Sequence, residues 1–134
     1  MEQRTLELSP GVELAPVTKA ISQERINRYA AAAGDFNPLH VDSEYAATTR
    51  FGGTIAHGML VLAFVSEMLT AAFGERWLSS GRLKIRFRGA ARPGDTVTCR
   101  GRVVESGPER TLCTVECTNQ NGEILLSGDA EVNA

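Results

Sequence analysis

Residues Gly58–Phe73, GMLVLAFVSEMLTAAF, decide which fold the rest of the sequence can adopt. Only Ser66, Glu67 and Thr70 interrupt their apolar character, and Gly74 follows as a natural end for a helix. A helix that is apolar nearly all round must be buried, and a helix of this length spans about 24 Å. The sequence therefore predicts one long interior helix with the other elements arranged round it.

After this segment the hydrophobic period changes to that of strands. Residues 82–88 (RLKIRFR) alternate strictly between charged and apolar side chains. Residues 96–105 and 110–119 predict two further strands, and Asn121-Gly122 predicts a hairpin before a last strand at 123–132. An antiparallel sheet wrapped round a long central helix fits this order. The pattern predicts an α+β protein of the hot-dog architecture, although it also allows other α+β rolls.

The first half of the chain contains shorter elements. Residues 11–18 (GVELAPVT) include a proline and predict an edge strand or an extended arm. Ser22 is expected to cap a helix that ends at Gly34, and Ser43 a second, short helix. Residues 35–40 lie between these helices, and their proline lacks an amide hydrogen, so we expect irregular backbone there.

The composition is that of an ordinary globular protein and predicts a single domain over residues 1–134. The net charge of −2 does not favour nucleic acid as a partner. The longest apolar run, Met59–Val65, is far shorter than the roughly 18 residues that cross a bilayer, so no membrane association is expected. The first ten residues, MEQRTLELSP, lack the apolar core of a secretory signal, and we expect a cytoplasmic protein.

The three cysteines, Cys99, Cys113 and Cys117, are expected to be buried or half-buried thiols. An odd number without a C-x-x-C pair predicts no disulfide framework. Cys113 and Cys117 lie on one face of an expected strand, but four residues of strand separate them by about 13 Å. That separation is too large for the two thiols to share a metal ion.

The segment Tyr29–His40, YAAAAGDFNPLH, places reactive side chains on a constrained loop. After Gly34 the loop presents Asp35, Asn37 and His40 within six residues. A carboxylate and an imidazole, which as a class titrates near neutrality, are suited to proton transfer. The alternative is that the aspartate and the asparagine stabilise a turn and the histidine merely packs.

A second candidate site segment, AHGML, leads into the buried helix. The first amides of a helix are unpaired and lie at its positive end, and Gly58 has no side chain to obstruct a ligand, so an oxyanion hole is possible there. The alternative is that Gly58 only packs closely against a strand and that His57 orients the loop through a backbone hydrogen bond. Ser66, about two turns further, either points into a ligand pocket or bonds back to a carbonyl one turn earlier.

Together, G-D-x-N-P-x-H over residues 34–40, H-G-M over residues 57–59 and Ser66 resemble the MaoC-type hydratase family. More narrowly, they are similar to the short single-domain (R)-specific enoyl-CoA hydratases that feed polyhydroxyalkanoate synthesis. The similarity extends over essentially the whole chain, including RFRGAARPGDTV at residues 86–97.

The resemblance implies the hot-dog fold and (R)-specific hydration of trans-2-enoyl-CoA to (R)-3-hydroxyacyl-CoA, together with the reverse dehydration. It implies an acyl-CoA or acyl-carrier-protein thioester as substrate, no cofactor or metal, and a homodimer or a dimer of dimers with the site near the dimer interface. Asp35 and His40 match the family's catalytic pair, Asn37 its supporting asparagine, Gly58 its oxyanion amide and Ser66 its site serine. The expected substrate-binding residues are His57, Met59, Leu69 and Val132.

Two other functions stay open on the residues alone. A hot-dog thioesterase would hydrolyse the C–S bond, usually with a single carboxylate, and a non-catalytic acyl-thioester-binding subunit would need neither Asp35 nor His40. The presence of both residues favours addition of water to a double bond. Which one is the base stays open, as does the acyl chain.

The site for the CoA phosphates is also left open. One strand carries a basic row, for which a solvated strand face is the preferred interpretation. Arg50 and Arg92 are equally unassigned. The row consists of Arg82, Lys84, Arg86 and Arg88.

Overall fold

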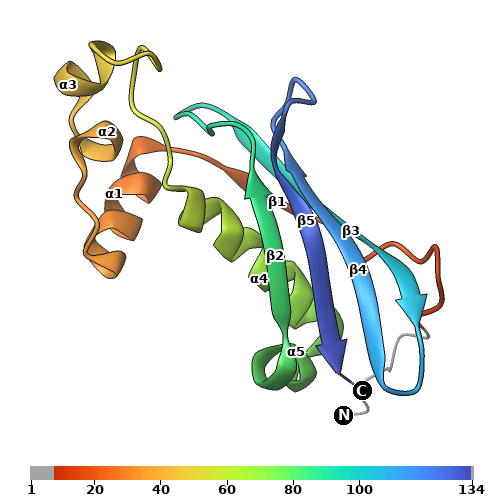
Figure 1. The fold of residues 1–134 in the computed structure, drawn as a ribbon. Coiled ribbons are helices and arrows are strands. Elements are labelled where there is room, and N and C mark those ends of the chain that lie inside the picture. The colour runs from red at the N-terminus through yellow and green to blue at the C-terminus, as the bar shows by residue number, and fades with distance from the viewer. Residues whose placement is uncertain (1–7, 134) are drawn as a thin grey trace.

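A curved antiparallel sheet lies along one side of a long central helix in the computed structural model, which describes residues 8–133 (Figure 1). Most of the stretch MEQRTLELSP, on which the expectation of no secretory signal depends, lies outside the described residues. The sheet order is β1-β3-β4-β5-β2. The elements are β1 Val17–Ala20, α1 Gln23–Ala33, α2 Pro38–Val41, α3 Ser43–Ala47, α4 Gly58–Phe73, α5 Glu75–Ser80, β2 Arg82–Phe87, β3 Thr96–Ser106, β4 Arg110–Thr118 and β5 Ile124–Asn133.

The central helix α4 has the bounds that its apolar run predicts, and it ends at Gly74, whose φ is +59°. Its apolar side chains pack against the concave face of the sheet, because every second residue of β3 and β4 points inward. The α+β hot-dog expectation is therefore confirmed. No helix within the described residues has both the length and the apolar character of a membrane span.

The strands β3, β4 and β5 are close to the predicted ones, and all their pairings are antiparallel. Strand β2 forms one edge of the sheet and pairs only with β5. Leu83 and Ile85 of β2 pack against the core, so Arg82, Lys84 and Arg86 project from the opposite, outer face.

The predicted edge strand or extended arm over residues 11–18 is confirmed in part: β1 lies at the sheet edge but begins only at Val17, and Glu13 makes an isolated bridge to β3. Other local expectations for the first half are wrong. Residues 38–41 form a helical turn, because Pro38 occupies the first helical position, where an amide hydrogen is not needed. The cap of α3 is Asp42, whose carboxylate accepts from two amides of the first turn, rather than Ser43. Helix α5 was not predicted.

The cysteine expectation is wrong for two of the three residues. Cys99 on β3 and Cys117 on β4 are joined by a disulfide, and their Cα atoms are 4.2 Å apart. The antiparallel register places them directly opposite each other, which the linear spacing of 18 residues does not reveal. Cys113 remains a buried thiol, and burial raises its pKa to about 11.

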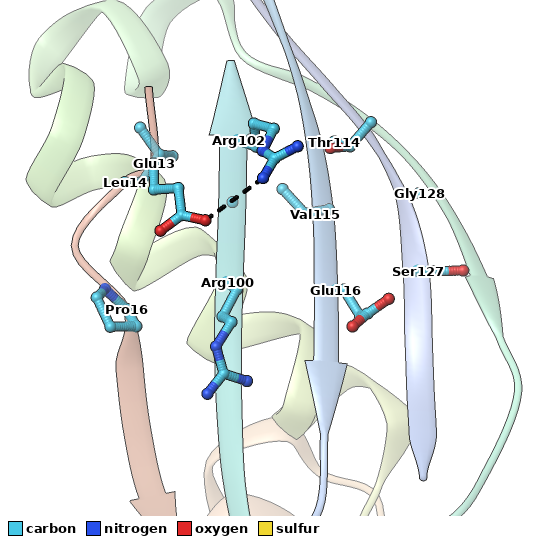
Figure 2. Close-up of a pocket in the computed structure, with 11 residues that line it drawn as sticks. Glu13, Leu14, Pro16, Arg100, Arg102, Thr114, Val115, Glu116, Ser127 and Gly128 are labelled. Atoms are coloured by element: carbon cyan, nitrogen blue, oxygen red, sulfur yellow. Dashed lines mark ion pairs between the residues drawn. The ribbon is translucent and has the colours of Figure 1, made fainter. Parts of the chain in front are cut away.

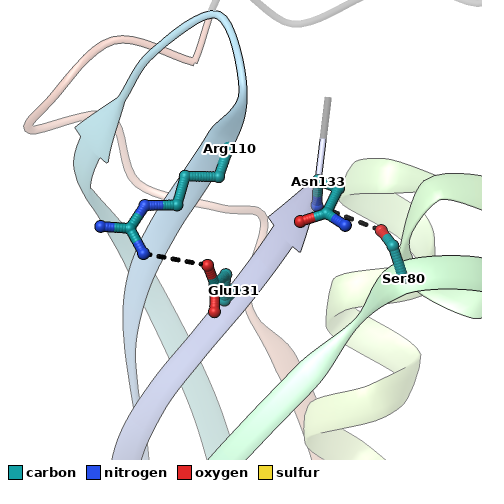
Figure 3. Close-up of polar contacts among 4 residues, drawn as sticks. All are labelled: Ser80, Arg110, Glu131 and Asn133. Carbon is teal, nitrogen blue, oxygen red and sulfur yellow. Dashed lines mark hydrogen bonds and ion pairs between the residues drawn. The ribbon is translucent and has the colours of Figure 1, made fainter.

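The end of β5 forms hydrogen bonds with helix α5 and an ion pair with strand β4. The backbone N–H of Asn133 donates to Ser80 Oγ at 3.1 Å, and Arg110 and Glu131 form an ion pair at 3.1 Å across β4 and β5 (Figure 3). Arg76 Nε also donates to the Asn133 carbonyl at 3.0 Å. These contacts hold Val132, between Glu131 and Asn133, in the core.

Candidate active site

The loop that carries Asp35 begins where α1 ends. Gly34 has a φ of 71°, a left-handed conformation that glycine adopts without strain, and it turns the chain out of the helix. The backbone N–H of Asn37 then donates to Asp35 Oδ1 at 3.2 Å. Asn37 Oδ1 accepts from the N–H of Leu39 at 3.0 Å and caps α2. The loop's own backbone thus orients the carboxylate of Asp35 and leaves its second oxygen without a contact in the described structure.

His40 lies in α2 with a defined tautomer in its neutral form. Its Nδ1 is 2.8 Å from the carbonyl oxygen of Ile55. A carbonyl can only accept, so Nδ1 carries the hydrogen and Nε2 carries the free lone pair. Gln23 Nε2 donates to the His40 carbonyl at 2.8 Å, and Thr54 Oγ1 donates to Gln23 Oε1 at 2.6 Å. The imidazole is therefore held in place, with Nε2 available for proton transfer.

His57 is buried, with 3% of its surface exposed, and it packs against the loop that carries Asp35. Its ring stacks on that of His40 with 3.9 Å between centroids, and the ring of Tyr29 lies 4.8 Å away. His57 Nε2 donates to the Asp35 carbonyl at 3.0 Å, which is the loop-orienting hydrogen bond considered from the sequence. Within residues 8–133 its Nδ1 has no hydrogen-bond partner.

Asp35, His40 and His57 together present three ligand-type atoms within 4.8 Å of one another. Such a cluster can serve a metal ion or proton transfer. An imidazole binds a metal through a lone pair in the plane of its ring, and the rings of His40 and His57 are stacked with only 26° between their planes. A single ion cannot lie close to both nitrogens and in both planes, so the arrangement favours proton transfer over metal binding.

The start of α4 adds unpaired backbone donors beside this cluster. His57 is the N-cap and Gly58 the first residue of the helix. Among the described residues, neither the Gly58 N–H nor the Met59 N–H donates to a protein acceptor. The ring of Phe87 on β2 covers Gly58 so closely that an added Cβ would lie 2.9 Å from Phe87 Cε1. Gly58 and Met59 are exposed, so a ligand can approach these amides.

The other expected site residues lie further along α4 and at the end of β5. Ser66 is about 12 Å along the helix axis from Gly58, at 1.5 Å per residue. Its Oγ accepts a hydrogen bond from Trp77 Nε1 at 3.1 Å. Leu69 and Val132 are both fully buried, with 0% exposure. None of these three belongs to the cluster of Asp35 and the two histidines.

Several supporting groups were missed in the sequence. They are the side chains of Gln23, Tyr29, Trp77 and Phe87 and the carbonyl of Ile55. Each acts through a contact between segments distant in the sequence, and none belongs to a local motif.

A pocket on the described chain lies away from these residues. It has a volume of about 470 Å³ and lies on the outer face of the sheet, where the side chains of Arg100, Arg102 and Glu116 project (Figure 2). Arg102 forms an ion pair with Glu13 at 3.6 Å across its rim. It contains none of the expected site residues, and its mixed charges give it no evident preference for a thioester.

The comparisons with known proteins agree with the fold and the motifs. A model of the MaoC-like domain matches residues 6–123, and the chain belongs to this family. The chain is 37% identical over 128 residues to the (R)-specific enoyl-CoA hydratase of Rhodospirillum rubrum, with 88% of this chain and 83% of the relative covered. It is 32% identical over 139 residues to the (R)-specific enoyl-CoA hydratase of Aeromonas caviae, with 98% of each covered.

Among solved structures, the chain is similar to the unliganded R-hydratase PhaJ1 from Pseudomonas aeruginosa. The TM-score is 0.84 at 33% sequence identity, with 96% of this chain and 83% of that chain covered. The similarity thus includes the helix and the loop that carry the candidate site as well as the sheet.

Proposed function

We propose that this protein catalyses (R)-specific hydration of trans-2-enoyl-CoA to (R)-3-hydroxyacyl-CoA and the reverse dehydration. The observation that carries the proposal is the cluster of the Asp35 carboxylate with His40, whose Nε2 is free, next to the unpaired amides at the start of α4. The names of the relatives from R. rubrum and A. caviae support the same reaction. Residues 1–134 act in it as one domain.

The reaction needs a base and an acid on one water molecule. In a conjugated enoyl thioester the β-carbon is electrophilic, so water attacks C3 while a proton is delivered to C2. Asp35 and His40 hold the water between them: one group removes a proton from it and the other supplies a proton to C2. Asn37 keeps the Asp35 carboxylate oriented. With a free Nε2 lone pair His40 is the base, and Asp35 in its protonated form then supplies the C2 proton. In the other assignment Nε2 of His40 is already protonated and supplies the C2 proton, and the Asp35 carboxylate is the base.

The N–H of Gly58 stabilises the enolate oxygen that forms as the hydroxyl adds. A helix N-terminus offers an unpaired donor in a fixed position, and a fixed donor costs no reorganisation when negative charge develops. His57 maintains the distance between this donor and Asp35 because it caps α4 and bonds to the Asp35 carbonyl. No metal or redox cofactor is required by these steps.

The acyl chain extends from this point along α4. Met59 lies beside the thioester, and Ser66, Leu69 and Val132 limit the far end of the acyl pocket. Leu69 and Val132 are fully buried, so little space is left for an acyl chain beyond them, and this favours short acyl chains. The carrier is CoA, with acyl carrier protein as the other possible thioester carrier.

The active unit is a homodimer in the cytoplasm. Strand β2 presents a free sheet edge, and Phe87 and Met59 at that side are 51% and 56% exposed. An unpaired strand edge flanked by apolar side chains favours pairing with a second copy.

The test follows the absorbance of the crotonyl-CoA double bond after addition of the purified protein, with the product passed to an (R)-specific 3-hydroxyacyl-CoA dehydrogenase. Loss of absorbance with dehydrogenase-reactive product is the expected result. Release of free thiol without an (R)-3-hydroxy product would instead identify a thioesterase. Neither change, with crotonyl-CoA and with longer enoyl-CoA substrates, would leave an acyl-thioester-binding role.

A further inference from the structure

Two groups of basic side chains could receive the phosphates of the thioester carrier, and the structure separates them. The members of the basic row that lie within β2, Arg82, Lys84 and Arg86, project from the outer face of the sheet, away from α4. By register Arg82 lies opposite Glu131 and Lys84 opposite Asp129 on β5. Glu131 is already paired with Arg110, whereas Asp129 can offset the charge of Lys84. This row lies on the face of the sheet that points away from α4.

Arg50 and Arg92, by contrast, both contact one residue, Phe51, in the loop after α3. The guanidinium of Arg50 lies over the ring of Phe51, 4.8 Å from its centroid. Arg92 Nη1 donates to the carbonyl oxygen of the same Phe51. The side chain of Arg92 thus joins the loop after β2 to the loop after α3, in which Arg50 lies beside the same phenylalanine.

These arginines are connected to the catalytic segment through the backbone. The N–H of Ala56 donates to the carbonyl of Ala91 at 2.8 Å. Ala91 precedes Arg92, and Ala56 lies two residues before Gly58. With about 3.8 Å between consecutive Cα atoms, Arg92 lies within roughly 17 Å of the Gly58 amide. This upper limit keeps Arg92 within reach of a pantetheine arm, which separates a thioester from the nearest carrier phosphate.

The charge of the pair is available for a ligand. Within residues 8–133 neither guanidinium forms an ion pair, and both side chains are exposed. The nearest carboxylate on the same turn, Asp95, is already engaged: its Oδ2 accepts from the Arg92 backbone N–H at 2.8 Å and its Oδ1 from Gln120 at 2.9 Å. These bonds also keep the turn that carries Arg92 in one conformation. Arginine is suited to phosphate because its planar fork donates two parallel hydrogen bonds.

We infer that Arg50 and Arg92 form the phosphate-binding site for the CoA carrier of the substrate. This inference rests on the proposed function, since it places a carrier phosphate within the reach of a pantetheine arm from the Gly58 amide. The outer-face row of β2 makes no contribution to carrier binding.

The test compares kcat/KM for crotonyl-CoA with kcat/KM for the crotonyl thioester of N-acetylcysteamine, which has no phosphate. We expect the double variant R50Q/R92Q to lower the ratio of the first to the second about tenfold or more. The matched control K84Q/R86Q removes the same charge from the outer face and should leave the ratio at the wild-type value. An unchanged ratio in R50Q/R92Q, including an equal loss with both substrates, would overturn the inference.

Binding of free CoA, measured by calorimetry, tests the site without turnover. We expect Kd to rise about tenfold in R50Q/R92Q and to stay unchanged in K84Q/R86Q. If the wild type binds CoA through these arginines but hydrates no enoyl thioester, the proposed function fails and the phosphate site stands. If the variant binds CoA as tightly as the wild type, the phosphate site fails whatever the activity. Binding of phosphopantetheine, measured by competition, identifies which phosphate is bound. If R50Q/R92Q weakens the binding of phosphopantetheine and of CoA equally, the arginines bind the pantetheine phosphate. If the variant weakens the binding of CoA alone, they bind the nucleotide phosphates.

Discussion

Asp35 and His40 are the two residues whose substitution tests the mechanism most directly. We expect Asp35→Asn and His40→Gln each to lower kcat on the order of 10²-fold or more, because each removes a group that transfers a proton. Both variants should stay folded, since Asp35 is exposed and His40 only partly buried. Asp129→Asn, which removes an exposed carboxylate on the outer face, is the matched control and should keep wild-type turnover. Near-wild-type kcat for either site variant would remove that residue from the mechanism.

A substitution of Gly58 tests the proposed oxyanion donor, again at the scale of a single residue. Its backbone is helical without a positive φ, so alanine is compatible with the conformation and favours the helix. The added Cβ meets only the tip of the half-exposed Phe87 ring, which can move aside. We therefore expect Gly58→Ala to keep its melting temperature but to lose about 10²-fold in kcat/KM, because the displaced ring and the new methyl group disturb the thioester position.

The double variant G58A/F87A separates the two causes of that loss. Partial recovery of kcat/KM would attribute the loss to the Phe87 ring, and no recovery would attribute it to the methyl group at the amide itself. A Gly58→Ala variant with undiminished kcat/KM would contradict a role for this helix start in the reaction.

At the scale of elements, the Cys99–Cys117 disulfide joins β3 to β4 in the middle of the sheet. For protein purified and denatured without reductant, we expect one alkylatable thiol per chain, that of Cys113. In the native protein Cys113 should react slowly at pH 8, because burial raises its pKa to about 11 and the thiolate is the reactive form. Mass spectrometry after alkylation counts the thiols. Three labelled cysteines in the denatured, unreduced protein would be incompatible with the cross-link.

The element scale also shows why some boundaries were predicted and others were not. Helix α4 was predicted to the residue because sixteen nearly continuous apolar residues followed by glycine allow only a buried helix. Helix α2 was missed because a proline usually indicates the end of a helix. Pro38 instead lies at the first helical position, where it is tolerated. Helix α5 was missed because its partners, Ser66 and the end of β5, are brought to it only by the tertiary fold.

At the scale of the whole molecule, the edge strand β2 predicts a second copy in solution. Light scattering coupled to size exclusion should give twice the 14.4 kDa mass of the chain. Phe87→Lys places a charge at the exposed apolar side of that edge and should shift the mass towards that of the monomer, with a parallel loss of turnover. A wild-type monomer with full turnover at all concentrations would contradict the homodimer.

The sequence by itself determined the fold class and the residues that could carry chemistry. The apolar run of α4, the alternating strands and the two short motifs are local patterns. Such patterns can be recognised without knowledge of the tertiary structure. Asp35, His40, His57 and Gly58 could be named because they lie in those motifs.

Only the tertiary structure decided how these residues meet and which other groups support them. The stacking of His40 on His57, the free Nε2 and the pairing of Cys99 with Cys117 depend on chain segments that are distant in sequence. The two basic groups also looked equivalent in the sequence, and the fold separated them by placing one on the outer face of the sheet and the other at Phe51, between two loops. The physical reason is that side-chain direction and strand register arise from packing the whole chain, whereas periodicity and motif spacing are properties of single segments.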